Sequence, residues 1–328
     1  MEFEMARNIR DFRKPDEFVA FITNRVYEGL PFLPVFLMRE LIFGIIAKCQ
    51  EKHPVTICHM LWMSNHFHMI VSGPSCKHIS KFYSQMQSEI AKMIKEFTGS
   101  YHRGLWEGRY SMQRIGTGED VIRMIAYLYT NPVKAGLVRT VEEWEGVNTY
   151  QMYRSGSNVR DCKNIAIRNF KHIRVDKFYA KEAAQKLYFD NLEGSYHEFR
   201  LSPNNWKYCF NEYRDKTDEE IFREVDAEIK ALELQYQTEY KNKFMGIAKI
   251  KKQSMTVKYT PKAKSPTPMI ICSDTKKRIE MIKDYKAFQQ KCHDSYKAWK
   301  TGLVSQKQYE YGAYRPGLPI VGRIKLVA

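Results

Sequence analysis

Two histidines stand one residue apart in the apolar stretch LWMSNHFHMIV, residues 61–71. Side chains alternate between the two faces of a β-strand, so His66 and His68 would share one face while Phe67 points to the other. Neutral imidazole is a common metal ligand, which makes the pair half of a candidate metal site. Two neighbouring structural histidines are the alternative, and only further ligands and a reacting group would favour the metal.

A second group of candidates lies in MIAYLYTNPVKAGLV, residues 124–138. On a helix, Tyr127 and Asn131 are one turn apart and share a face. An amide oxygen is a hard ligand, and together with two imidazoles it suits Mg²⁺ or Mn²⁺ better than zinc. A tyrosine beside such a metal can attack a phosphodiester and become the covalent link to it.

Three observations weaken this assignment. Tyr129 lies about 200° around the helix from Tyr127, so the two phenols cannot both face one metal. The chain has 21 tyrosines, and an ordinary core aromatic is the alternative interpretation of Tyr127. Pro132 disfavours helical geometry at Asn131, so we expect the helix to end or kink there.

The elements that must position these residues alternate in a recognisable order. Apolar runs predict strands at 18–29, 55–63, 66–73 and 110–115, and helical spacing predicts helices at 35–53, 78–99 and 118–136. The first six elements match a ferredoxin-like, split βαβ arrangement. This α+β fold has a four-stranded antiparallel sheet covered by two helices on one face, which leaves the other face free for a site.

The composition is that of a globular protein, and its charge is unevenly distributed. The net charge is +16, and residues 241–328 alone hold 20 Lys/Arg against 5 Asp/Glu. Such asymmetry favours a polyanionic partner, most often nucleic acid, over a merely solubilising tail. The seven cysteines form no CxxC pair, which argues against a zinc ribbon or a disulfide framework. We find no membrane-spanning or signal-peptide pattern and expect a cytoplasmic, nucleoid-associated protein.

The pattern changes after residue 150, so we predict a catalytic domain at 1–150 and a mostly helical, basic extension at 151–328. A long charged helix is expected at 216–244, with Thr217 and Glu220 forming a capping box. A basic, proline-bearing linker follows at 249–268, and another basic helix at 274–300. The extension would bind DNA or a partner.

Three motifs together resemble a known family. They are, in this order, MSNHFHMIV, GLWEGRYSMQRI at 104–115 and AYLYTNPVKAGLV. Together they resemble the tyrosine transposases of the HUH superfamily, in which HUH stands for His, hydrophobic, His. The REP-associated tyrosine transposases, relatives of the single-tyrosine insertion-sequence transposases, are the most similar group. The resemblance covers roughly residues 15–150. Ser64 departs from the family's usual proline before Asn-His, which alters the rigidity of the turn but not the ligands.

The resemblance implies a function for each candidate. His66, His68 and Asn131 would bind Mg²⁺ or Mn²⁺, and Tyr127 would be the nucleophile. The enzyme would bind single-stranded or hairpin DNA, cut one strand through a 5′-phosphotyrosine intermediate, and rejoin strands by reversal. Small relatives can build the site across a homodimer, and the sequence does not decide whether this chain does so.

Other residues are weaker candidates for DNA contacts. Arg109 and Arg114 could hold phosphate, and Trp106 could stack a base, although packing under the tyrosine helix is the favoured role of this tryptophan. Four lysines of the basic linker would contact the DNA backbone without base specificity: Lys251, Lys252, Lys262 and Lys264.

Other functions remain open. A replication initiator or relaxase would use the same chemistry, although the chain has no P-loop for a helicase motor. A domesticated, non-catalytic DNA-binding protein would keep the fold and the basic tail. A structural protein with a charged tail would show no affinity for DNA at moderate salt.

Overall fold

The structure is a computed structural model that describes residues 10–73, 76–99, 104–257, 268–300 and 312. The chain divides into two compact units. The larger unit comprises residues 15–273, and the smaller one comprises residues 1–14 and 274–328. The boundary predicted at residue 150 lies inside the larger unit, and the division of roles between 1–150 and 151–328 stays a prediction.

The predicted ferredoxin-like arrangement is present at the start of the larger unit. Its elements are β1 (Val19–Arg25), α1 (Phe36–Lys52), β2 (Thr56–Trp62), β3 (His66–Ser72), α2 (Cys76–Thr98), β4 (Ser111–Ile115) and α3 (Gly118–Lys134). The four strands pair antiparallel in the order β2-β3-β1-β4, which confirms the predicted fold class. A two-residue strand that the sequence did not predict, β7 (Ile270–Ile271), extends the sheet parallel to β4.

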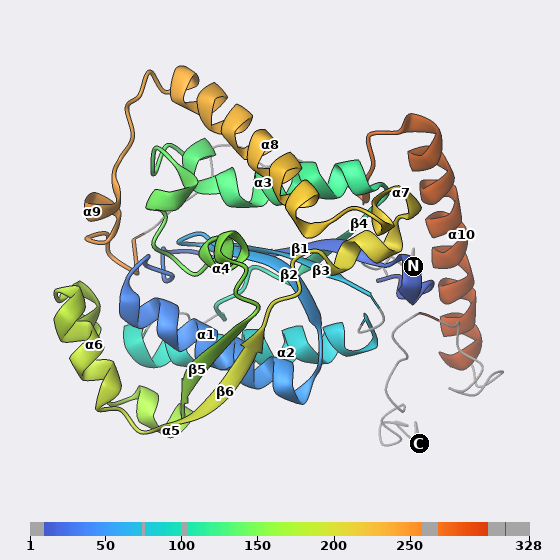
Figure 1. Cartoon of the computed structure of the whole chain (residues 1–328). Coiled ribbons are helices and arrows are strands. Elements are labelled where there is room, and N and C mark those ends of the chain that lie inside the picture. The colour runs from blue at the N-terminus through green and yellow to red at the C-terminus, as the bar shows by residue number, and fades with distance from the viewer. Residues whose placement is uncertain (1–9, 74–75, 100–103, 258–267, 301–311, 313–328) are drawn as a thin grey trace, which may run out of the picture. The chain divides into compact units, whose positions relative to one another are not determined.

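Helices cover both faces of this sheet (Figure 1). On one face, Tyr83 of α2 stacks on Phe67 and donates a hydrogen bond to the sulfur of Met69 at 3.1 Å. On the other face, α3 packs on Phe21 and Ile70 in one continuous core, and α8 (Asp218–Glu239) packs along α3. Because side chains alternate along β3, His66 and His68 point to the same face as Ile70, toward α3.

A two-stranded ribbon packs against α1 and was not predicted. It consists of β5 (Val159–Ile165) and β6 (Gly194–Arg200), which pair antiparallel. Gly44 of α1 lies directly against the carbonyl of Lys163, where a Cβ atom would not fit. Arg160 reaches both carboxylate oxygens of Glu40 at 2.6 Å.

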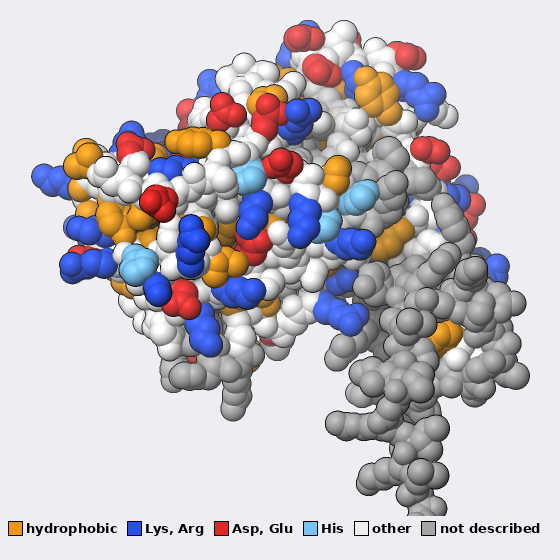
Figure 2. Space-filling model, turned by 90° about the horizontal axis from the view of Figure 1, so that it is seen from below, with side chains coloured by type: hydrophobic (Ala, Val, Ile, Leu, Met, Phe, Trp, Pro, Cys, Tyr) orange, Lys and Arg blue, Asp and Glu red, His pale blue; other side chains and the backbone are white. Residues whose placement is uncertain are grey.

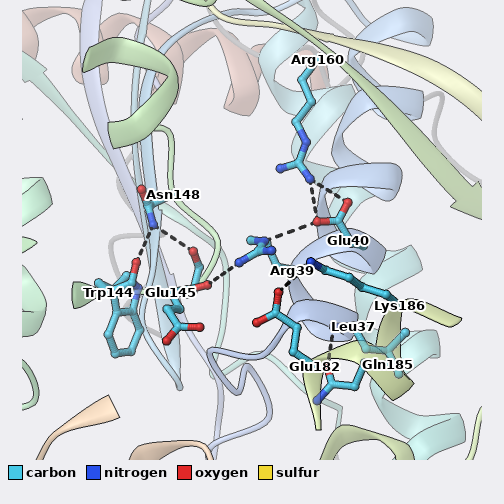
Figure 3. A network of polar contacts seen from close by, with 11 residues as sticks. Leu37, Arg39, Glu40, Trp144, Glu145, Asn148, Arg160, Glu182, Gln185 and Lys186 are labelled. Atoms are coloured by element: carbon cyan, nitrogen blue, oxygen red, sulfur yellow. Dashed lines mark hydrogen bonds and ion pairs between the residues drawn. The ribbon is translucent and has the colours of Figure 1, made fainter. Parts of the chain in front are cut away.

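Polar contacts extend from this junction around the start of α1 (Figure 3). Arg39 lies 3.3 Å from Glu40 and donates a hydrogen bond to the carbonyl of Glu145 at 3.2 Å. Gln185 of α6 (Glu182–Asp190) accepts a hydrogen bond from the backbone N–H of Leu37, at the start of α1, at 2.9 Å. The ribbon and α6 are therefore joined to the same helix that covers the sheet.

The remaining helices of the larger unit are short apart from α8. They are α4 (Tyr150–Ser155), α5 (Ile167–Phe170), α7 (Asn211–Arg214) and α9 (Ile247–Ile250), with 3₁₀ turns at Pro15–Glu17, Val141–Glu143, Val175–Tyr179 and Asn205–Cys209. Thr217 and Glu220 form the predicted capping box at the start of α8. The predicted linker overlaps only the last two residues of α9, and its residues 258–267 lie outside the described residues.

In the smaller unit, α10 (Thr275–Lys300) confirms the predicted basic helix. Arg13 lies 2.9 Å from Asp11 and 2.9 Å from Asp284 of this helix, and its guanidinium lies over the ring of Phe288. Figure 2 shows Lys and Arg side chains spread over the face of the molecule that is seen from below. Among the described residues, no helix is both long and apolar enough to span a membrane.

Candidate active site

The histidine pair lies on the face of β3 that is turned toward α3. The rings of His66 and His68 have centroids 4.8 Å apart, so the two residues share a face as the alternation predicts. His68 is 6% exposed and stacks on Phe21 of the neighbouring strand with centroids 5.1 Å apart. The register of β1 with β3 places His68 opposite Thr23 and His66 opposite Arg25.

The hydrogen bonding of the two rings is unusual for buried histidines. Both ring nitrogens of His68 are buried, and neither has a hydrogen-bond partner among the described residues. Nδ1 of His66 lies 2.7 Å from Oδ1 of Asn65, which can only accept, so this nitrogen donates and Nε2 is left with its lone pair. Burial without a partner is costly, and such a group calls for an explanation such as an ion or ligand.

The surroundings keep both imidazoles neutral. Burial lowers the pKa of His66 to about 4, and the nearby Arg25 acts in the same direction. Burial also lowers the pKa of His68, with further lowering by His66, Lys134 and Arg25. The Asn131 side chain raises this pKa, although the two side chains do not reach ordinary hydrogen-bond geometry. Neutral imidazole is the form that binds metals, so both rings are competent ligands near pH 7.

Of the two neighbouring tyrosines, the structure brings only Tyr127 to the histidines. Its ring centroid lies 6.1 Å from that of His68 and 6.1 Å from that of Phe21, and the residue is half-buried. Tyr129 is fully buried on another side of α3, where its hydroxyl lies 2.8 Å from Nδ1 of His59 and 2.9 Å from Oγ1 of Thr149. Tyr129 is therefore a core residue.

Asn131 lies one turn after Tyr127, and the helix continues past Pro132. The expectation that α3 ends at Asn131 was wrong, because α3 runs to Lys134 and Ala135 still donates to the carbonyl of Asn131 at 3.0 Å. Pro132 has no backbone N–H, so one hydrogen bond of the helix is missing there, but the helix continues past it. Nδ2 of Asn131 donates to the carbonyl of Tyr127 at 3.1 Å, which leaves Oδ1 free to act as a ligand.

Two cations near the histidines were missed in the sequence. Nζ of Lys134 lies 4.7 Å from the centroid of the Tyr127 ring, and both Lys134 and Arg25 act electrostatically on His68. Neither cation forms an ion pair within the described part of the chain. Lys134 follows Tyr127 and Asn131 at helical spacing, which could have identified it, whereas Arg25 is placed only by the pairing of β1 with β3.

The weaker candidates lie elsewhere. Arg114 pairs with Ala20, on the opposite face from Phe21, and donates to the carbonyl of Glu17 at 3.2 Å. Trp106 donates to the carbonyl of Gln87 at 2.9 Å and packs beside Phe67, on the side away from the histidines. Arg109 is exposed in the loop before β4. Their roles in DNA binding stay predictions.

The four predicted DNA-contacting lysines have different positions. Lys251 forms an ion pair with Glu145, and Lys252 is exposed. Lys262 and Lys264 lie outside the described residues. A backbone phosphate would therefore have to compete with Glu145 for Lys251.

The residues present fit a hard divalent cation. The unpartnered nitrogens of His68, the oriented ring of His66 and the free Oδ1 of Asn131 supply two imidazoles and one amide oxygen. No group of three or more His, Cys, Asp or Glu side chains suited to a metal occurs among the described residues, so the candidate set relies on the amide. Part of the coordination would then fall to water or substrate oxygens, as is usual for Mg²⁺.

Comparisons with known proteins agree with the motifs. Residues 37–131 match the model of the family described as "Transposase IS200 like". This segment runs from α1 to Asn131 and includes both histidines and Tyr127. This part of the chain is therefore similar to an IS200-like transposase domain.

The predicted resemblance to the REP-associated tyrosine transposases is confirmed by a relative. A curated relative from Haemophilus influenzae, named "Putative REP-associated tyrosine transposase", is 23% identical over 103 residues, or 29% of this chain. The chain spans 58% of that relative's length. A solved structure of a REP-associated tyrosine transposase bound to a REP hairpin matches with a TM-score of 0.37 and 18% identity, covering 47% of this chain and 86% of that one.

Proposed function

We propose that this protein is a DNA strand transferase that cuts and rejoins single-stranded or hairpin DNA through Tyr127. The observation that supports it most is the half-buried phenol of Tyr127 facing a histidine whose two nitrogens have no partner among the described residues. The alternative interpretations of these residues, as ordinary core groups, do not account for that histidine, because buried polar groups normally have a partner.

The proposed chemistry is the one that the resemblance to the tyrosine transposases implies for these side chains. The Tyr127 oxygen attacks the phosphorus of one phosphodiester, and its proton passes to solvent. As the new phosphorus–oxygen bond forms, the bond from phosphorus to the 3′ oxygen breaks, and that oxygen takes up a proton. The products are a 5′-phosphotyrosine and a free 3′-OH. Because the phosphotyrosine keeps the energy of the phosphodiester, attack by a 3′-OH reverses the step.

His66, His68 and Asn131 would hold the metal. Mg²⁺ or Mn²⁺ would polarise the scissile phosphate and stabilise the charge of the transition state. Lys134 and Arg25 have no described acidic partner and lie on the same side, so they are suited to the phosphate's other oxygens. The basic extension would add contacts to the DNA backbone, which weaken with salt.

The test uses end-labelled single-stranded hairpin DNAs from the sequence that flanks the gene. Each is incubated with the full-length protein and Mg²⁺ or Mn²⁺, and the products are separated on a denaturing protein gel. We expect label to migrate with the protein, and this adduct to be lost with EDTA or in Tyr127→Phe. Tyr129→Phe serves as the matched control and should retain the adduct. An adduct that persists in Tyr127→Phe would show that the nucleophile is wrong.

A non-catalytic DNA-binding protein is the second candidate. It is favoured by the lack, within the described residues, of a carboxylate that completes the metal site. Binding of the same hairpins without an adduct under either metal would support it. A relaxase or replication initiator would give the same adduct, and only the choice of DNA site would distinguish it.

A further inference from the structure

The histidine-bearing face of the sheet opens to solvent along β1. Phe21 is 4% exposed and stacks on His68. Thr23 and Arg25 follow at two-residue spacing and are partly exposed. Tyr27, two residues further, lies just past the end of the strand and is 50% exposed. Because alternate side chains of a strand share a face, this series leads from the candidate site out to solvent.

The alternation of side chains continues past the end of β1. Val26 is 2% exposed and pairs antiparallel with Trp106, which packs beside Phe67 on the face away from the histidines. The N–H of Val26 donates to the carbonyl of Asn65 at 2.9 Å. Since Val26 is buried on the far face, the side chain of Tyr27 leaves the backbone on the face of the histidines.

The backbone that carries Tyr27 is held by hydrogen bonds to other segments. The N–H of Tyr27 donates to the carbonyl of Leu105 at 2.8 Å, and the N–H of Leu30 donates to the carbonyl of Met255 at 2.9 Å. The aromatic ring is therefore presented on a support that is already ordered. A ligand that binds to such a ring loses little free energy in ordering the loop.

The ring of Tyr27 is not committed to the fold. Among the described residues, no other ring stacks on it and no cation lies over it. A single exposed aromatic residue is common on protein surfaces and needs no function by itself. The position of Tyr27 is what distinguishes it, because the neighbouring Arg25 is close enough to act electrostatically on both His66 and His68.

Arg25 and Tyr27 together offer what one nucleotide presents to a protein. A guanidinium binds phosphate, and an aromatic ring stacks on the face of a base. The rise along an extended chain places the Cα atom of Tyr27 about 7 Å beyond that of Arg25. A strand whose phosphate reaches the histidines can therefore leave the site past Arg25 with its next base over Tyr27. In a duplex both faces of a base are covered by its neighbours, so only an unstacked base can take this position.

From this arrangement we infer that Tyr27 is a stacking platform for an unpaired base next to the phosphate that is cut. This inference rests on the proposed function. It requires the cut to lie beside at least one unpaired nucleotide. Because stacking on an aromatic ring tolerates every base, Tyr27 would select for an unpaired nucleotide and not for its identity.

The test measures binding of hairpin DNAs that carry a single-stranded flank. Full-length Tyr127→Phe is the parent, so that no strand is cut during the measurement. Adding Tyr27→Ala should weaken binding about 5-fold to 100-fold, the loss expected for one stacked base, whereas Tyr27→Phe should stay within about 2-fold of the parent. Tyr196→Ala is the matched control, because Tyr196 is 71% exposed on β6, and it should change nothing.

Two further measurements separate stacking from a general loss of DNA affinity. The slope of affinity against salt concentration should be the same in Tyr27→Ala and the parent, because no charge is removed. Abasic sites are then placed one at a time along the flank. At one position next to the cut, the abasic site should weaken binding to the parent as much as Tyr27→Ala does, and should add nothing in Tyr27→Ala.

The inference is overturned if Tyr27→Ala binds as tightly as the parent, or if its loss adds to that of the abasic site at every position. It is also overturned if Tyr27→Phe loses as much as Tyr27→Ala, because the ring would then not be the binding group. The proposed function is tested separately with Tyr127 intact. A wild type that forms no adduct on any hairpin contradicts that function, so the two failures are distinguished by different assays.

Discussion

Replacing His68 with leucine should stabilise the metal-free protein while abolishing strand transfer. The imidazole has one donor and one acceptor, both buried and without a partner among the described residues. Leaving a buried polar group unsatisfied costs about 1–3 kcal/mol, so the two nitrogens together cost roughly 2–6 kcal/mol. Leucine has a similar volume and removes that cost, but it loses the stacking on Phe21, which contributes about 0.5–1.5 kcal/mol. We expect His68→Leu to raise the free energy of unfolding by about 0.5–5 kcal/mol.

The assay is urea unfolding of wild type and variant in EDTA, followed by the same titration with Mn²⁺. Tyr129→Phe is the control, because it removes a buried polar group that is fully bonded, to His59 and Thr149. It should lower the free energy of unfolding by about 1–3 kcal/mol. Mn²⁺ should stabilise the wild type but not His68→Leu. A His68→Leu variant as unstable in EDTA as Tyr129→Phe would refute the reasoning that His68 is kept unsatisfied for a ligand.

Three further predictions concern the fold. Thr217→Ala removes the capping box of α8 and should lower the free energy of unfolding by about 1 kcal/mol in urea titrations, with little change in Thr217→Ser. Gly44→Ala forces a Cβ atom against the carbonyl of Lys163 and should cost about 1–3 kcal/mol or prevent folding, whereas Gly108→Ala, with nothing near its Cβ and no positive φ, should cost less. Burial lowers the pKa of His59 to about 3, so the unfolded chain, with a pKa near 6.5, binds a proton first as the pH falls. The free energy of unfolding should therefore fall by about 2 kcal/mol between pH 7 and pH 5 because His59 stays neutral in the folded protein. In His59→Gln the free energy of unfolding should depend correspondingly less on pH in this range.

The sequence predicted the elements with strong patterns. The seven elements of residues 19–134 agree with the expected ranges to within a few residues, because each has a long apolar face or clear ends. The ribbon β5–β6 was missed, because its strands VRDCKNI and GSYHEFR mix charged and apolar residues and are ordered by contact with α1. Strand β7 has only two residues, too few for any period to appear.

The parts of the candidate site that lie on a single strand or helix could be predicted from the spacing of residues along that element. The spacing of His66 and His68 on a strand, and of Tyr127 and Asn131 on a helix, was enough to propose that each pair shares a face. Arg25 was not predictable in this way, because only the antiparallel register of β1 with β3 brings it beside His66. The packing of α8 and the turn after it against α3 depends likewise on contacts between residues more than ninety positions apart.

The enclosure of Tyr129 has a consequence for stoichiometry. With its hydroxyl held between His59 and Thr149 in the core, the helix presents one phenol to the histidines, not two. Under the proposed chemistry, each chain can hold at most one DNA end covalently at a time. The second end of an excised segment would have to arrive as a free 3′-OH or be carried by another molecule. The number of labelled strands per protein chain, counted at saturating DNA, should therefore not exceed one.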